Sequence, residues 1–188
     1  MRTTALASKK ATYADIEALP PNMVGEIIYG TLHAHPRPAP RHARSASRLI
    51  SKLEPPFDSG DGGPGGWVIL LEPEIHLGEH VVVPDIAGWK RSRISDFPET
   101  SHFEVAPDWI CEILSPSTAR IDRTEKLTVY AEQDVGYVWL IDPNQRTLEV
   151  LTLNNSKWLI SQTFKDDDAV CTVPFEELKF DLQSLWKF

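Results

Sequence analysis

Two carboxylates set in apolar segments are the residues of this sequence best placed to do chemistry. Asp85 follows the apolar run 81–83 and Pro84, and Glu112 lies inside the apolar run 109–114. A carboxylate buried in a strand costs free energy unless it is protonated, hydrogen-bonded or bound to a cation. The question posed by the sequence is therefore what these two acids bind.

Acids at strand ends with a lysine nearby suit the hydrolysis of a phosphodiester. Two or three carboxylates can hold a hard cation such as Mg²⁺, which prefers oxygen ligands and lowers the pKa of bound water. A neighbouring lysine can stabilise the charge that develops on the phosphate. Glu74 is a further candidate ligand, because a hairpin closed by residues 78–80 would bring it opposite Asp85.

Hydrophobic alternation and turn residues predict that short strands position these acids. Both faces of segment 109–114 are largely apolar apart from Glu112, as expected for a central strand covered on both sides. We expect an N-terminal β-hairpin and a C-terminal antiparallel meander. The first strand of the hairpin carries Glu26, which we interpret as an exposed or hydrogen-bonded strand residue, with a further site acid as the alternative. The predicted strands cover residues 23–29, 31–35, 67–71, 74–77, 81–83, 109–114, 137–141, 147–153 and 158–164.

Helical periodicity predicts three helices between these strands. Lys126 lies in the last of them, where it can form an ordinary surface pair with Asp122, one turn away. The amphipathic segment 175–188 is expected to close over the core or over a neighbouring subunit. The predicted helices cover residues 13–19, 41–53 and 120–132.

Basic residues recur at three- and four-residue steps along the predicted helix 41–53, and no acid interrupts residues 31–53. This is the best candidate nucleic-acid surface in the chain, and a solvated helix face is the alternative. We interpret His42 as a packing or hydrogen-bonding histidine, with a general base as the alternative, and His33 and His35 as structural. The basic residues are Arg41, Arg44, Arg48 and Lys52.

The composition is that of one globular domain over residues 1–188. The formal net charge of −8 opposes nucleic-acid binding globally but leaves room for a local basic surface. No apolar run reaches the ~18 residues of a membrane span, and no signal peptide is evident, so we expect a cytoplasmic protein. Residues 1–10 and the Gly- and Pro-rich loop 55–66 are expected to be flexible.

Several other kinds of site lack their required patterns. Cys111 and Cys171 form no Cys-x-x-Cys pair, which argues against a disulfide framework or structural zinc. The glycine-rich segment 61–66 lacks the Gly-Lys-Ser/Thr ending of a phosphate-binding loop. Ser115 and Ser117 do not lie in a Gly-x-Ser-x-Gly nucleophile elbow.

The ordered series of motifs resembles the PD-(D/E)xK nuclease superfamily, and more narrowly the restriction-endonuclease-like family of small bacterial proteins. The resemblance covers most of the chain, and it is the order of the motifs that makes it specific. His42 also belongs to the series. The motifs are GEIIYG at 25–30, VPDIA at 83–87, WICEILSPST at 109–118, KLxxY at 126–130 and VGYVWLIDP at 135–143.

The resemblance implies a restriction-endonuclease-like α/β core in which helices flank a central mixed sheet. It implies Asp85 and Glu112 as ligands of Mg²⁺ or Mn²⁺, DNA as the substrate, and a homodimer or higher homo-oligomer. The superfamily pattern Glu-x-Lys would place a lysine at position 114, where this chain has Leu114. In the narrower family the lysine stands on the next helix, which makes Lys126 the catalytic candidate.

These features support a metal-dependent DNA endonuclease that uses an activated water. The alternative is a catalytically inactive module of the same fold that binds nucleic acid or a protein partner, favoured by Leu114 and by the net acidity. A third possibility is a structural role for the buried acids, in which their removal destabilises the fold without altering any binding.

Overall fold

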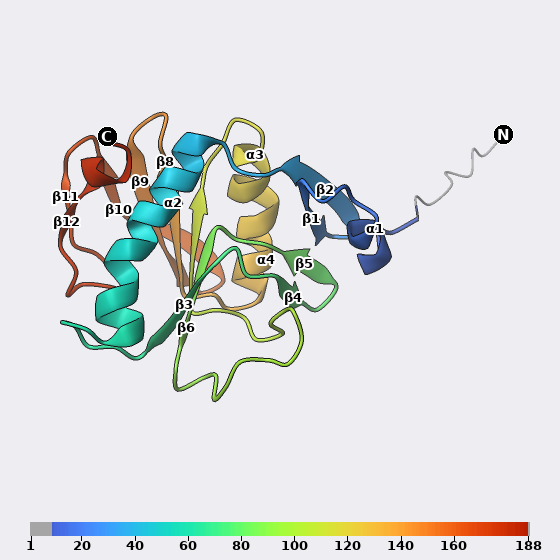
Figure 1. The fold of residues 1–188 in the computed structure, drawn as a ribbon, viewed down its shortest axis with the longest axis horizontal. Helices are drawn as coiled ribbons and strands as arrows, with labels where there is room; N and C mark the ends of the chain where they lie inside the picture. The colour runs from blue at the N-terminus through green and yellow to red at the C-terminus, as the bar shows by residue number, and fades with distance from the viewer. Residues whose placement is uncertain (1–8, 188) are drawn as a thin grey trace.

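The computed structural model describes residues 9–187, which are organised around a six-stranded mixed sheet (Figure 1). Its strands β7 and β8 run parallel, and the four remaining pairs of neighbouring strands are antiparallel. This arrangement confirms the predicted central mixed sheet and the C-terminal meander. In spatial order the strands are β10 (Lys157–Lys165), β9 (Thr147–Asn154), β8 (Tyr137–Asp142), β7 (Trp109–Ile113), β6 (Ile86–Lys90) and β3 (Trp67–Leu71).

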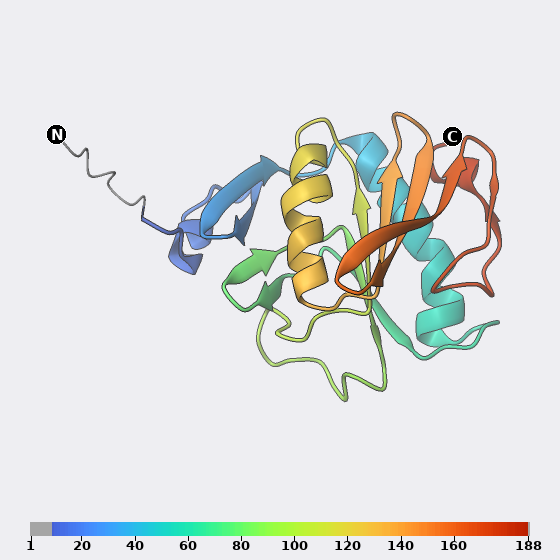
Figure 2. The ribbon, with the colours of Figure 1, turned by 180° about the vertical axis from the view of Figure 1, so that it is seen from behind.

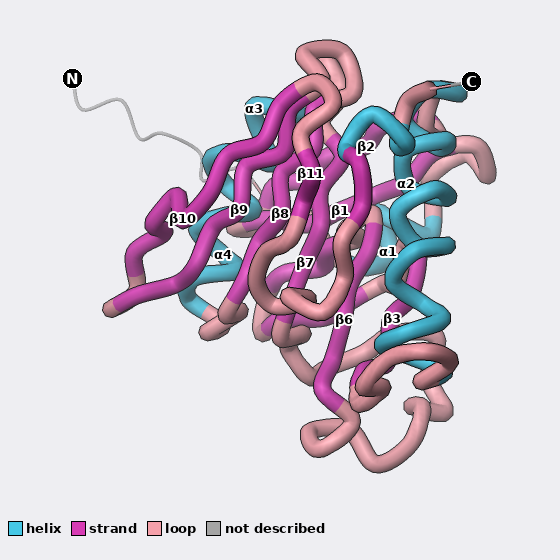
Figure 3. The backbone as a smooth tube through the Cα atoms, turned by 90° about the vertical axis from the view of Figure 1, so that its left-hand side faces the viewer, coloured by secondary structure: helices cyan, strands magenta, loops and turns pink. Residues whose placement is uncertain are grey.

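A second, four-stranded antiparallel sheet contains the predicted N-terminal hairpin. Figure 3 shows the strands of the meander side by side, with β1 and β2 lying beyond them. In spatial order the second sheet has β2 (Thr31–Pro36), β1 (Met23–Ile28), β5 (His80–Val82) and β4 (Ile75–Leu77), and a separate pair is formed by β11 (Ala169–Val170) and β12 (Phe180–Asp181).

Helices cover both faces of the larger sheet (Figures 1 and 2). The long helix α2 lies over one face, and the helical segment 119–132 lies over the other. The segment 119–132 contains a π-helical turn, η2, between two α-helical parts. The helical elements are α1 (Tyr13–Glu17), α2 (Pro40–Leu53), η1 (Glu54–Ser59), α3 (Ala119–Ile121), η2 (Asp122–Lys126), α4 (Leu127–Glu132) and η3 (Leu182–Leu185).

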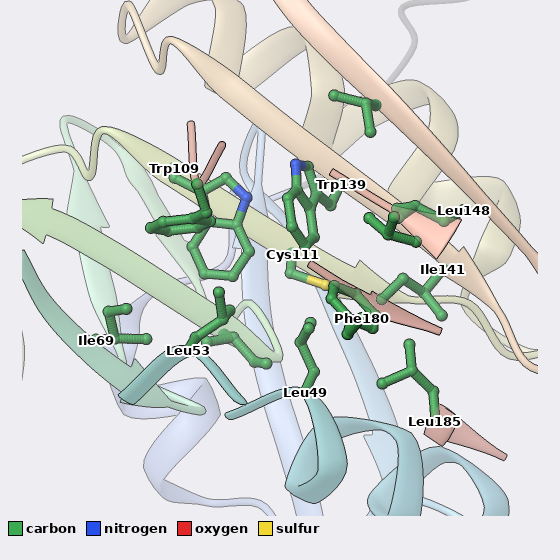
Figure 4. Close-up of a cluster of buried hydrophobic side chains, with 14 of the residues drawn as sticks. Leu49, Leu53, Ile69, Trp109, Cys111, Trp139, Ile141, Leu148, Phe180 and Leu185 are labelled. Atoms are coloured by element: carbon green, nitrogen blue, oxygen red, sulfur yellow. The ribbon is translucent and has the colours of Figure 1, made fainter. Parts of the chain in front are cut away.

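The core under α2 is aromatic and aliphatic. Figure 4 shows Leu49 and Leu53 pointing from α2 toward Trp109, Cys111 and Trp139 of the sheet. All five side chains are buried, and the two indole rings meet edge to face with their centroids 5.4 Å apart. Such an aromatic pair contributes about 0.5–1.5 kcal/mol beyond its area burial, which helps to fix β7 beside β8.

The opposite face of β7 packs against α4. Val129 and Tyr130 of this helix are buried together with Ile110 and Val138 of the sheet. Glu112 projects to the same side, because alternate residues of a strand share a face. The central strand predicted from its apolar pattern is therefore covered on both sides, with one carboxylate enclosed on the α4 side.

The structure corrects one of the two predicted flexible segments, and most of the other lies outside the described residues. Residues 55–59 of the expected flexible loop 55–66 belong to the π-helical turn η1 (Glu54–Ser59), because Phe57 is buried in the core under α2. Residues 1–8 of the segment 1–10 lie outside the described residues. Across residues 9–187, no helix combines the length and apolar character that crossing a membrane requires.

Candidate active site

A cavity of about 310 Å³ is lined by residues of the β1–β2 hairpin, the start of α2, the entry to β6, the end of β7 and the helical segment 119–132. Both sheets therefore contribute to its wall. Five of the candidate site residues predicted from the sequence border it: Glu26, His42, Asp85, Glu112 and Lys126.

Asp85 stands directly before β6, where strand pairing brings it beside Glu112. The pair Ile86–Cys111 in the β6–β7 register places positions 85 and 112 next to each other on neighbouring strands. One carboxylate oxygen of Asp85, Oδ2, accepts the backbone N–H of Ile113 at 2.6 Å. The side chain is thus fixed at the end of the sheet by a backbone donor.

The second oxygen of Asp85 faces a histidine from α2. His42 Nε2 lies 3.2 Å from Asp85 Oδ1. Burial by itself would lower the pKa of His42, but the hydrogen bond to Asp85 and its charge outweigh burial and raise the pKa. This contact agrees with the interpretation of His42 as a hydrogen-bonding residue, since it orients the carboxylate.

Glu112 is 2% exposed and makes its polar contacts with one helix. The Tyr130 hydroxyl donates to Glu112 Oε1 at 2.5 Å, and Lys126 Nζ lies 2.8 Å from the same oxygen. Burial raises the pKa of the Glu112 carboxyl well above its ordinary value, while Lys126 opposes this rise. A carboxylate in this position holds its charge only through nearby cations.

Lys126 is a buried cation surrounded by acids. Its Nζ lies 2.8 Å from Glu112, 3.0 Å from Glu26 and 3.6 Å from Asp122. Burial would lower the pKa of Lys126, but Glu112 and Glu26 outweigh burial and raise it well above its ordinary value. The lysine is therefore a stable positive charge and not a base. Leu114, at the position of the superfamily lysine, is buried in the apolar core.

Helical spacing explains why these groups meet. Asp122, Lys126 and Tyr130 recur at four-residue intervals, so they lie on one face of the helical segment. The π-helical turn η2 spans Asp122 to Lys126, and such turns are frequent at functional sites. Asp122 and Lys126 do pair, at 3.6 Å, but the expected surface location of this pair is wrong, because both side chains are buried in the site.

Glu26 of the N-terminal hairpin completes the charge cluster. Its Oε1 accepts the backbone N–H of Val83 at 2.8 Å, and its Oε2 lies 3.7 Å from His35 Nε2. Burial would raise the pKa of Glu26, but Lys126, His35 and the N–H donor lower it to about 2. Glu26 is therefore an ionised, buried acid that holds Lys126.

Sequence reasoning gave several of these residues too little weight. Glu26 interrupts an apolar strand as Glu112 does, and that shared signal could have singled it out. Asp122 and Tyr130 share the four-residue spacing of Lys126, which could have assigned them to the same face. His35 gave no sequence signal of its own, because its place in the cavity depends on how the two sheets meet.

Glu74 lies away from this cavity. The β4–β5 register pairs Ile75 with Val82, so position 74 falls beside 83 and not beside Asp85. Glu74 instead contacts Tyr13 and His76. The expected facing of Glu74 and Asp85 is therefore wrong.

The basic residues of α2 differ in their surroundings. Arg41 and Arg48 are exposed, whereas Arg44 donates to the Lys187 carbonyl at 2.6 Å. The ammonium of Lys52 lies 5.6 Å from the centre of the Phe180 ring. Arg41 and Arg48 are thus the members of the predicted basic surface best placed to meet a phosphate backbone.

The donor set of the cavity suits a hard divalent ion. Asp85 and Glu112 offer carboxylate oxygens from neighbouring strands, the ligand type that Mg²⁺ and Mn²⁺ prefer. Within residues 9–187, the acids and histidines of this cavity do not bring three ligand atoms within 4.8 Å of one another. The protein therefore offers a partial ligand set, and water and phosphate oxygens would supply the rest, as Mg²⁺ commonly requires.

The chain is similar to known proteins in both its sequence and its fold. A family model, Uma2, described as "Putative restriction endonuclease", matches residues 11–183. The crystal structure of a putative nuclease belonging to DUF820 from Anabaena variabilis ATCC 29413 is similar, with a TM-score of 0.72 and 26% sequence identity. The match covers 94% of this chain and 97% of that chain. No curated protein matches the chain.

Proposed function

We propose that this chain, which belongs to the Uma2 family of putative restriction endonucleases, hydrolyses phosphodiester bonds in DNA with the help of a divalent ion. The family and the similar nuclease structure support a nuclease-like function. The observation that carries the proposal is the convergence of Asp85, Glu112 and Lys126 on one cavity.

Asp85 and Glu112 are the residues that would hold the ion. Restriction-endonuclease-like families generally use divalent metals, and Mg²⁺ or Mn²⁺ fits this all-oxygen donor pair. When bound, such an ion neutralises phosphate charge and lowers the pKa of water. His42 and the Ile113 N–H hold the two oxygens of Asp85, so this side chain is oriented before the substrate arrives.

Lys126 supplies positive charge where the phosphate would lie. It remains protonated because acids surround it, so it can donate hydrogen bonds to a phosphate oxygen but cannot abstract a proton from water. Glu26 and Asp122 keep its ammonium at the cavity wall. A lysine from the helix thus takes the role that the superfamily pattern would assign to position 114.

The outer face of α2 would contact the DNA backbone. Arg41 and Arg48 project from a helix whose first turn also delivers His42 to the cavity. Phosphate contacts of this kind position DNA without reading its sequence. A local basic surface of this kind is needed because the chain carries a net charge of −8.

The proposal is tested by DNA cleavage with Mg²⁺, Mn²⁺ or EDTA, comparing the wild type with Asp85→Asn and Glu112→Gln. Cleavage by the wild type should require the divalent ion, and each variant should fail to cleave DNA even when the ion is present. Glu125→Gln is the matched control, because Glu125 lies on the same helical segment but outside the cavity lining. Undiminished cleavage by either site variant would refute the assignment.

A non-catalytic binding module is the second candidate. The specific observation in its favour is the raised pKa of Glu112, since a protonated carboxyl is a poor metal ligand. Calorimetric titration with Mg²⁺ and Mn²⁺ separates the two candidates. The endonuclease requires ion binding that weakens in Asp85→Asn, whereas the binding module predicts DNA or protein binding with no ion bound at these acids.

A further inference from the structure

A second group of metal-ligating side chains lies outside the catalytic cavity. Glu74, His76 and His102 bring one ligand atom each to within 4.8 Å of one another. All three residues are half-buried, and none of them lines the cavity that holds Asp85 and Glu112. Two imidazoles and a carboxylate are a different donor set from the two carboxylates of the catalytic cavity.

The backbone holds this cluster together across a long separation in sequence. The His76 N–H donates to the Phe103 carbonyl at 2.8 Å, and the Phe103 N–H donates to the Glu74 carbonyl at 3.0 Å. Ile75 and Phe103 form a parallel bridge, and both side chains are buried. The side chains are thus presented from a fixed platform, as a binding site requires.

The side chains of the cluster already contact one another. His76 Nε2 lies 2.8 Å from Glu74 Oε1, and the rings of His76 and His102 stack with centroids 3.7 Å apart. The Tyr13 hydroxyl donates to the same Glu74 oxygen at 2.9 Å. A hydrogen bond to a ligating carboxylate is the usual support that surrounds a metal ligand and fixes its orientation.

We propose that Glu74, His76 and His102 bind a late first-row divalent transition ion, with Zn²⁺ as the reference case. Imidazole with one carboxylate suits such ions, whereas Mg²⁺ prefers oxygen ligands alone. With bonds of about 2.0–2.2 Å, ligand atoms on one ion lie at most about 4.4 Å apart, so the cluster reaches this geometry through small side-chain rotations. Water or Glu104, whose Oε1 is 3.7 Å from His102 Nε2, takes the fourth position.

The ion would join three parts of the chain. Glu74 and His76 belong to the β4 region, His102 to the long connection between β6 and β7, and Tyr13 to α1. Binding would hold that connection and α1 against the small sheet, so it should raise the thermal stability of the protein. The site is structural and separate from phosphodiester hydrolysis.

Calorimetric titration of the full chain with Zn²⁺, in excess Mg²⁺ that occupies the oxygen-ligand site, tests this proposal. The wild type should bind one equivalent of Zn²⁺ and gain thermal stability. His76→Asn and His102→Asn should each weaken that binding at least about 10-fold, because each removes a ligand. His33→Asn is the matched control, because this histidine belongs to neither site and should leave Zn²⁺ binding unchanged.

A spectroscopic measurement guards against misfolded variants. Co²⁺ in place of Zn²⁺ should give visible absorption bands of a four- or five-coordinate ion in the wild type and in His33→Asn, and these bands should be lost in His102→Asn. Circular dichroism shows whether each variant is folded. Equal Zn²⁺ binding by the wild type and a folded His102→Asn protein, or no Zn²⁺ binding by the wild type, would overturn the proposal.

Discussion

Lys126 determines the charge balance of the candidate active site. Its ammonium lies within 3.6 Å of three carboxylates, all of them buried. Taking charges out of water is costly, and a buried ion pair tolerates this cost only while both signs are present. The acids that keep Lys126 charged therefore need its positive charge in turn, because without it they would be buried and unpaired.

Replacing Lys126 should impair both catalysis and folding. Lys126→Met should reduce DNA cleavage by about 10²-fold or more, because one charged donor to the reacting phosphate is lost. It should also destabilise the fold by about 3–5 kcal/mol, since Glu26 and Glu112 lose their cation. Single-turnover cleavage and urea unfolding measure the two effects. A stable variant that cleaves DNA at the wild-type rate would exclude Lys126 from the site.

Glu26 should give the protein a pH-dependent part of its stability. Its pKa of about 2, against an ordinary value of 4.5, corresponds to about 3 kcal/mol at neutral pH. Because the folded-state pKa is lowered, this contribution is present above pH 4.5 and is lost as the pH falls toward 2. Urea unfolding of the wild type and Glu26→Gln should differ by about 3 kcal/mol at pH 7 and converge between pH 4.5 and 2. A difference in unfolding free energy that stays the same from pH 7 to pH 2 would show that it does not come from the charge of Glu26.

The Tyr130 hydroxyl should contribute through its hydrogen bond to Glu112. Tyr130→Phe removes the donor at 2.5 Å and leaves a buried carboxylate with one fewer partner. We expect a loss of about 1–3 kcal/mol in the free energy of unfolding. Tyr29→Phe is the control, because the Tyr29 hydroxyl donates to the exposed Glu132 and should contribute little. Equal effects of both substitutions would argue against a special role for the buried bond.

Periodicity predicted most of the strands and the helices because burial dictates it, but it missed β6 (Ile86–Lys90), the strand that pairs with β7 and places Asp85 beside Glu112. The alternating faces of β7 and the helical spacing of α2 are direct consequences of packing on both sides of one sheet. Asp85 and Glu112 could be found because each is a carboxylate in an apolar segment. Lys126 was reached through family resemblance, since its separation from Glu112 along the chain carries no local signal.

The register of β4–β5 and the structure of residues 54–59 were not predicted, because both depend on tertiary packing. In the observed β4–β5 register, Glu74 lies two residues away from the expected pairing with Asp85 and joins the cluster with His76. The turn residues alone do not determine this register. The segment 54–59 forms a helical turn because Phe57 is buried in the core. This tertiary packing outweighs the preference of the neighbouring prolines for a loop.

The connection between η1 and β3 should be sensitive to a single methyl group. A Cβ at Gly63 would lie 2.5 Å from the backbone carbonyl oxygen of Pro56, so the backbone must shift. Gly63→Ala should therefore lower the melting temperature by several degrees, consistent with a loss of about 1–3 kcal/mol. Gly136→Ala is the matched control, because its Cβ would meet its nearest atom at an ordinary 3.4 Å. An unchanged melting temperature for Gly63→Ala would contradict this packing.

For the whole molecule, the cavity depends on both sheets. The small sheet contributes Glu26 through β1, and the larger sheet contributes Glu112 through β7. The helical segment 119–132 joins them, because Lys126 contacts an acid from each sheet. The N-terminal hairpin is thus part of the cavity wall and supplies a buried acid to it.

DNA binding by this acidic protein should depend strongly on salt. Arg41→Ala and Arg48→Ala should each weaken binding about equally for unrelated DNA sequences and reduce the slope of log affinity against log salt concentration by about 1. Lys157→Ala, at the start of the distant strand β10, is the control. Fluorescence anisotropy in a salt series measures these slopes. Arginine variants with unchanged slopes would show that α2 does not meet the DNA backbone.

The most direct test of the proposed nuclease activity is ion-dependent DNA cleavage by wild type, Asp85→Asn and Glu112→Gln, each purified and shown to be folded. We expect cleavage by the wild type in Mg²⁺ or Mn²⁺, none in EDTA, and none by either variant. Cleavage that persists in either folded variant, or a wild type that binds no divalent ion and leaves DNA intact, would contradict the proposed nuclease activity.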